Sequence, residues 1–133
     1  MTDDRIIYNA LKTPDGTIIE SRHRHDYVTH TDKNGKEYMI DGGLDYVRSS
    51  AHADQEYLTV SMDDGHDKVR EALTWGTFGK NGDEPYRQVK LREMSNAHIQ
   101  ACLDTQPRMY KQSRTAMENE LAYRKEQNII IED

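Results

Sequence analysis

The chain has 133 residues, of which 35% are hydrophobic and 32% charged, with a formal net charge of −6 at pH 7. This length allows one domain with a modest core, and the acidic balance disfavours a general nucleic-acid binder, which needs a basic surface. Cys102 is the only cysteine, which excludes an intramolecular disulfide and a cysteine-based zinc site. No apolar stretch approaches the ~20 residues of a transmembrane helix, and "MTDDRIIYNA" has no signal-peptide pattern. We therefore expect a cytoplasmic protein without a membrane partner.

The first half of the chain, residues 1–62, is predicted to be mainly β structure. "TPDG" separates the apolar stretches "RIIYNALK" and "TIIESRHRH", and "DKNG" separates "DYVTHT" from "KEYMID". Both short segments are typical of tight turns. Gly42 and Gly43 indicate a bend, and "QEYLTVS" is a further candidate strand.

The second half, residues 63–133, is predicted to be mainly helical. The acidic start of "DDGHDKVREALTW" and its apolar spacing predict a helix over about 64–75. A loop or hairpin is expected near residues 76–90, with its turn at Asn81-Gly82.

Two further helices are expected near the end of the chain. Ser95 is the predicted cap of "NAHIQACLDT", in which Cys102 lies on the buried face, and Pro107 is placed in the first turn of "RMYKQSRTAMENELAYRKEQN". Met117 and Leu121 continue an apolar seam on the second helix, which serves either for docking within the domain or for helix–helix oligomerisation.

These elements together predict one α+β domain over residues 1–133. An antiparallel sheet of hairpins forms the N-terminal half, and two or three helices form the C-terminal half. Because the apolar content is low, we expect subunits to share burial in a homo-oligomer.

The stretch "SRHRHDYVTH", residues 21–30, carries the densest set of functional side chains. If it is a strand, Arg22 and Arg24 lie on one face, roughly 7 Å apart, where two guanidinium groups can bracket a phosphate. His23 and His25 then lie on the other face. The alternative is a solvated edge strand that happens to be polar.

A zinc site is a second interpretation of the same stretch. His23, His25 and His30 offer three imidazoles. Ligands that alternate along one strand need further ligands from other elements, and the sequence does not indicate which. We therefore assign no metal and no cofactor.

Two other segments combine glycine, aromatic residues and arginine, "DGGLDYVRSS" and "TWGTFGKNGDEPYR". Glycine lets backbone amides approach a ligand, and an aromatic face can stack on a base. Arg48 is a candidate phosphate ligand and Trp75 a candidate base ligand. For Trp75 the alternative is a core anchor of the second half.

The segments "ESRHRHD" and "DGGLDYVR" resemble a widespread family of small uncharacterised proteins in tailed phages and some bacteria. That family carries "ESxHxHD" and "DGGxDYxRR" motifs among paired cysteines that resemble a small zinc ribbon. The resemblance covers Asp15–Ser50. It departs at the cysteines, where this chain has Leu11 with its neighbours and His30-Thr31, so the hairpin framework is expected without the metal. The segment from Trp75 to about Gln106 also looks like phage proteins of unknown role.

The resemblance implies a phage accessory protein in the bacterial host cytoplasm. By analogy of size and setting with phage proteins that sequester nucleotide immune signals, our first hypothesis is an anti-defence protein. It would bind a cyclic ADP-ribose or cyclic dinucleotide signal, and no nucleic-acid polymer. The expected ligand-binding residues are Arg22, Arg24, His25, His30, Arg48 and Trp75.

Two other functions stay open at this point. A phosphodiesterase that cleaves such a signal would use His23, His25 and His30 as general acid and base. A protein–protein inhibitor would place its acidic surface in the basic site of a host enzyme.

Overall fold

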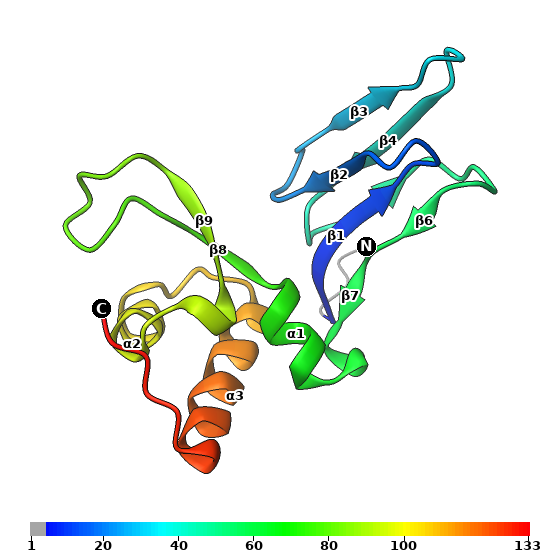
Figure 1. The fold of residues 1–133 in the computed structure, drawn as a ribbon. Coiled ribbons are helices and arrows are strands. Elements are labelled where there is room, and N and C mark those ends of the chain that lie inside the picture. Colours follow the sequence, from blue (N-terminus) through cyan, green and yellow to red (C-terminus); the bar gives the residue numbers. More distant parts are fainter. Residues whose placement is uncertain (1–4) are drawn as a thin grey trace. The chain divides into compact units, whose positions relative to one another are not determined.

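The computed structural model describes residues 5–133 (Figure 1). Residues 1–4, which open the predicted β half, lie outside the described part. The described chain divides into two compact units, a first unit that ends at Ser61 and a second unit, Met62–Asp133. The predicted α+β class is confirmed, because antiparallel strands fill the N-terminal half and three α-helices lie in the C-terminal half. The prediction of a single domain stays a prediction.

The first unit contains a sheet built around its longest strand, β1 (Ile6–Lys12). The predicted "TPDG" turn is confirmed: the Gly16 backbone N–H donates to the Thr13 carbonyl at 2.9 Å, with φ at +91° for Gly16. Figure 1 shows β1 between its partners, which are all antiparallel to it. They are β2 (Ile18–Ser21), β6 (Glu56–Tyr57) and β7 (Val60–Ser61).

A second antiparallel sheet of the first unit has the order β3 (Val28–Thr31), β4 (Glu37–Asp41), β5 (Arg48–Ser49). The predicted hairpin at "DKNG" is confirmed, because the Gly35 N–H donates to the Asp32 carbonyl at 3.0 Å.

The two sheets of the first unit share one apolar core. Leu11 of β1 and Ile19 of β2 pack with Tyr38 and Ile40 of β4, and Val28 lies against the cluster. Because side chains alternate along a strand, this core fixes the register of β1, β2 and β4.

The second unit combines one hairpin with three α-helices and two short 3-10 helices, which are labelled η. The hairpin predicted near residues 76–90 is confirmed, and the helix predicted over 64–75 is shorter because Thr74 begins the hairpin. The elements are η1 (Met62–Asp64), α1 (His66–Ala72), β8 (Thr74–Thr77), β9 (Arg87–Lys90), η2 (Leu91–Glu93), α2 (Asn96–Thr105) and α3 (Lys111–Gln127).

The helix ends of the second unit test two sequence predictions. The Ser95 cap of α2 is confirmed, since its Oγ accepts from the His98 backbone N–H at 3.0 Å. The position of Pro107 was predicted wrongly: α3 begins at Lys111, and Tyr110 at its N-cap has an extended ψ of 142°. Pro107 therefore belongs to the preceding loop, which Gln106 opens.

Helix α3 contacts α1, α2 and η2 within the second unit. Met117 of the predicted seam is fully buried, whereas Leu121 is half-buried. Cys102 of α2 is buried, as predicted. The buried face of α3 is largely polar and comprises Gln112, Ser113, Ala116, Met117, Glu120 and Arg124.

Within residues 5–133, no helix has both the length and the apolar character that a transmembrane span requires.

Candidate functional site

The segment between β2 and β3, residues 22–27, is a turn, and the prediction that it continues as a strand is wrong. The Asp26 N–H donates to the His23 carbonyl, and His25 has a φ of +64°. The cause is local hydrogen bonding: the Asp26 carboxylate accepts the Arg22 backbone N–H at 2.8 Å. Short polar side chains that bond nearby backbone in this way compete with strand pairing. Pleat alternation therefore does not set the spacing of Arg22 and Arg24.

The glycine-rich segment after β4 is linked to this turn by hydrogen bonds through Ser21. The Gly43 N–H donates to Ser21 Oγ at 2.8 Å, and the Ser21 hydroxyl donates to the Asp26 carbonyl at 2.7 Å. Asn9 Nδ2 donates to the carbonyls of Asp41 and Gly43 at 3.1 and 3.0 Å. We call this set, Asn9, Ser21, Asp26, Asp41 and Gly43, the polar junction.

Asp41 is the most connected member of the polar junction. Its carboxylate is almost fully buried, at 6% exposure of the side chain. Oδ1 accepts the Gly42 N–H at 2.8 Å, and Oδ2 accepts from the Tyr46 hydroxyl at 3.2 Å and Arg48 Nη2 at 3.0 Å. His25 Nδ1 lies 3.0 Å from the same hydroxyl. Burial and the Asp41 hydrogen bond raise the pKa of Tyr46, which keeps its proton between these groups.

The cationic side chains of the motif differ in what they contact. Arg22 forms an ion pair with Glu20 at 2.9 Å, and Arg48 is held by Asp41. Arg24 is exposed, and its guanidinium makes no ion pair or hydrogen bond with residues 5–133. The structure therefore leaves the full hydrogen-bonding capacity of Arg24 to a ligand.

The histidines of the motif divide between two places. The His23 side chain is 72% exposed, 4.0 Å from the Asp26 carboxylate, and His25 contacts Tyr46 in the same region. His30 instead places Nε2 2.8 Å from Asp15 Oδ2, in the turn that precedes β2.

The turn that contains Asp15 and the turn that contains His25 lie at opposite ends of β2, so the three histidines do not converge. The hydrogen bonds from Thr13 and His30 lower the pKa of the Asp15 carboxyl. Over residues 5–133, no group of three or more His, Cys, Asp or Glu side chains is placed to hold a metal ion. The zinc hypothesis thus has no ligand set in the described part of the chain.

Trp75 belongs to the second unit, where it is half-buried on β8 opposite Val89 of β9. Trp75 therefore belongs to a different unit from Arg22, Arg24 and Arg48.

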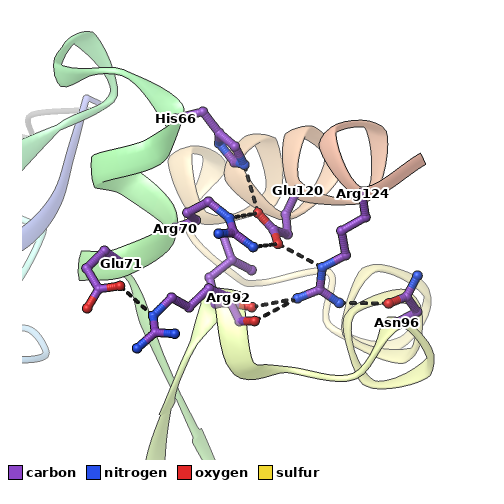
Figure 2. A network of polar contacts seen from close by, with 8 residues as sticks. His66, Arg70, Glu71, Arg92, Asn96, Glu120 and Arg124 are labelled. Carbon is purple, nitrogen blue, oxygen red and sulfur yellow. Dashed lines mark hydrogen bonds and ion pairs between the residues drawn. The ribbon is translucent and has the colours of Figure 1, made fainter. Parts of the chain in front are cut away.

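A cluster of charged residues lies in the second unit, around the Glu120 carboxylate (Figure 2). His66 Nε2 and Arg70 Nε lie 2.9 and 2.8 Å from Oε1, and Arg70 Nη2 lies 2.9 Å from Oε2. Arg124 Nε adds a bond of 2.7 Å to Oε2. The Arg70 guanidinium also lies over the ring of Tyr123, 4.7 Å from its centroid.

Arg124 extends this cluster to the start of α2. Its Nη1 donates to Asn96 Oδ1 at 2.8 Å, and its Nη2 donates to the carbonyls of Leu91 and Arg92 at 3.0 and 3.3 Å. Figure 2 shows these bonds converging from α1, α2, α3 and η2.

The cluster around Glu120 is structural. The side chains of Glu120 and Arg124 are 0% exposed. Both carboxylate oxygens of Glu120 accept hydrogen bonds, and the guanidinium of Arg124 donates from Nε and Nη2. Burial raises the pKa of Glu120, but the hydrogen bonds from Arg70, Arg124 and His66 outweigh it, so the pKa lies below its ordinary value. The sequence signal was an i, i+4 Glu–Arg pair on α3, a spacing that is also common on solvated helix faces.

We compared the chain with protein-family models, with curated proteins and with solved structures, and none of them matches it.

The polar junction predicts a severe effect of Gly43→Ala. A Cβ at Gly43, where φ is +52°, would lie 2.5 Å from the His23 backbone carbon. We expect a loss of about 2–4 kcal/mol of unfolding free energy, from backbone strain and overpacking, measured by urea denaturation. Gly16→Ala is the matched control, because φ is +91° with nothing within 4 Å, and it should lose about 1 kcal/mol. Equal losses in the two variants would contradict this role of Gly43.

The charged cluster predicts that Glu120→Gln destabilises the protein by about 3–5 kcal/mol, because buried cations lose their counter-charge. Since the pKa of Glu120 is depressed in the folded state, its contribution is present above the unfolded pKa and lost as pH falls through the folded pKa. Urea denaturation at several pH values should therefore show the wild type approaching the variant in acid. Glu118→Gln, on the exposed face of α3, should change stability by less than about 0.5 kcal/mol. A loss of that size for Glu120→Gln would refute the assignment.

Proposed function

We propose that the turn between β2 and β3 binds the phosphate of a small nucleotide, and that the protein sequesters this nucleotide without cleaving it. The observation that supports the proposal is the environment of Arg24. Its guanidinium is exposed and unpaired with residues 5–133, on a turn that the polar junction holds rigidly from beneath.

The chemistry of this turn suits a phosphate. A guanidinium offers a planar fork of donors that matches two phosphate oxygens. The imidazole of His23 is exposed beside Arg24, and that of His25 is oriented by Tyr46. Because the turn is held by hydrogen bonds from Ser21 and Asp26, little conformational freedom is lost on binding.

An aromatic surface for the base is available next to the turn. Tyr27 follows directly in the chain, with 54% of its surface exposed. Base stacking on such a ring tolerates different bases.

Binding is favoured over cleavage because the histidines are already engaged. A phosphodiesterase needs a general acid and a general base at one phosphate. His30 is bonded to Asp15, at the far end of β2, and His25 is bonded to Tyr46. Both ring nitrogens of His23 also have contacts, since Nδ1 lies 3.0 Å from the Arg24 carbonyl oxygen and Nε2 lies 4.0 Å from the Asp26 carboxylate.

The class of nucleotide rests on an analogy of size and setting with phage proteins that sequester nucleotide immune signals. We propose a cyclic ADP-ribose or cyclic dinucleotide immune signal as the ligand, bound by a homo-oligomer in the bacterial host cytoplasm. Arg22 and Arg48 would contribute once their partners Glu20 and Asp41 share them with the phosphate.

The proposal predicts that Arg24→Gln weakens nucleotide binding at least about tenfold, because a hydrogen bond to a charged group contributes about 1.5–3 kcal/mol. Calorimetric titration with 3′,3′-cyclic-di-GMP, 3′,3′-cyclic GMP–AMP and cyclic ADP-ribose measures it. Arg108→Gln, an exposed arginine of the second unit, serves as the matched control and should bind as the wild type does. Equal binding by Arg24→Gln and the wild type would place the site elsewhere.

A release experiment separates sequestration from cleavage. The protein is incubated with each nucleotide, separated from free ligand, heated, and the released material is analysed by chromatography. Intact nucleotide supports sequestration. A linear product would instead support a phosphodiesterase, and the absence of any retained nucleotide would refute the proposed function.

A further inference from the structure

A cavity of about 710 Å³ lies within the second unit, walled by the β8–β9 hairpin, α2 and the segment after α3. This volume falls in the range of about 300–1,000 Å³ that is usual for small-molecule sites. Its apolar lining includes Val89, Met94 and Ala101. The cavity shares no residue with the turn of the first unit.

Some polar groups of the cavity are already paired with one another. Asp133 accepts a hydrogen bond from Ser95 Oγ and lies 3.6 Å from Lys80 Nζ. The segment that carries Asp133 is held to α2 by two bonds, from the Asn96 N–H to the Ile131 carbonyl at 2.8 Å and from the Ile131 N–H to Asn96 Oδ1 at 3.0 Å.

Four other side chains that line the cavity have no such partners. The side chains of Arg87, Glu84 and Glu132 make no ion pair or hydrogen bond within the part of the chain that the structure describes. The same holds for the ring nitrogens of His98. Burial lowers the pKa of His98, Asp133 raises it and Arg87 lowers it further, so both charges act on the His98 ring.

The balance of charge in the cavity decides the class of ligand. Two cationic side chains, Lys80 and Arg87, face four carboxylates, those of Glu84, Glu93, Glu132 and Asp133. A free phosphate would add negative charge to this excess, and a simple amine would leave Arg87 without an anion. A ligand that carries one ammonium and one carboxylate satisfies both sets.

We infer that this cavity binds a small zwitterion of the free α-amino acid type. The carboxylate pairs with Arg87 and accepts from His98, the ammonium donates to Glu132 and Glu84, and the amino-acid side chain lies on the apolar lining. A cavity of this size also has room for a dipeptide, whose two charged ends are of the same kind.

The test uses the full chain and each common free L-amino acid in turn, first by thermal shift and then by calorimetric titration. At least one amino acid should raise Tm and bind. Its descarboxy amine and its desamino acid, tested separately, should each bind at least about tenfold more weakly, since a hydrogen bond to a charged group contributes about 1.5–3 kcal/mol. Inorganic phosphate should not bind this cavity.

Two variants assign the contacts. Arg87→Gln and Glu132→Gln should each weaken binding of that amino acid at least about tenfold, and because neither side chain has a partner, the Tm without ligand should stay unchanged. Arg108→Gln and Glu118→Gln, which change exposed residues outside the cavity, are the matched controls. Arg24→Gln should also leave amino-acid binding intact, so this proposal and the nucleotide proposal can fail separately.

Three results would overturn the inference. They are the absence of binding by every amino acid tested, binding of the descarboxy amine as tight as that of the zwitterion, and unchanged binding in Arg87→Gln.

Discussion

The chain has few apolar residues to bury, so many polar groups leave water on folding. Each such group needs a hydrogen-bonding partner inside the protein, and the structure depends on those partners. Glu120 shows the requirement at its strongest. Its carboxylate is fully buried and accepts from two arginine side chains, Arg70 of α1 and Arg124 of α3, and it lies 2.9 Å from a ring nitrogen of His66. Arg124 carries the same cluster on to η2 and α2. The helices of the second unit are therefore joined by charge as much as by Met117 and the other apolar residues. Hydrogen bonds between charged groups are directional, so they fix one arrangement of the helices where apolar contact alone would allow several.

The same constraint explains the motif of the first unit. Ser21, Asp26 and Asp41 are residue types that often bind ligands, yet here their polar atoms are engaged by Gly43, Arg22 and Arg48. These residues form the framework of the site, and they hold a turn whose side chains point to solvent. A motif that recurs among small proteins can thus combine two roles, with buried members that fix the backbone and exposed members free to act. Arg24 belongs to the second group, whereas the exposed ring of His23 already contacts the Arg24 carbonyl and the Asp26 carboxylate.

Much of the fold follows from local patterns in the sequence. The turns at "TPDG" and "DKNG", the β8–β9 hairpin and the Ser95 cap are set by residues within a few positions of one another. The turn at residues 22–27 escaped the same reasoning, because alternation predicts a strand there, while the Asp26 carboxylate and the distant Gly43 stabilise a turn. The Glu120 cluster and the cavity of the second unit were also not predicted. His66 and Glu120 are 54 residues apart, and the lining of the cavity extends from Thr77 to Asp133, so no local pattern records which charged residues will meet.

Three arginines show how environment, and not residue type, separates structural from functional charge. In Arg124 the donors on Nε, Nη1 and Nη2 all have acceptors inside the protein, so binding a ligand would first require breaking bonds worth more than a surface contact returns. Arg24 and Arg87 have no acceptors within residues 5–133, and each lies where a ligand can reach it. What distinguishes their two environments is the surrounding charge. Four carboxylates line the cavity of Arg87, whereas at the turn of Arg24 the Asp26 carboxylate accepts the Arg22 backbone N–H and the Asp41 carboxylate is paired with the Arg48 guanidinium. A simple anion can therefore bind at Arg24. A ligand that binds at Arg87 must carry a positive charge as well as a negative one, because carboxylates surround this arginine.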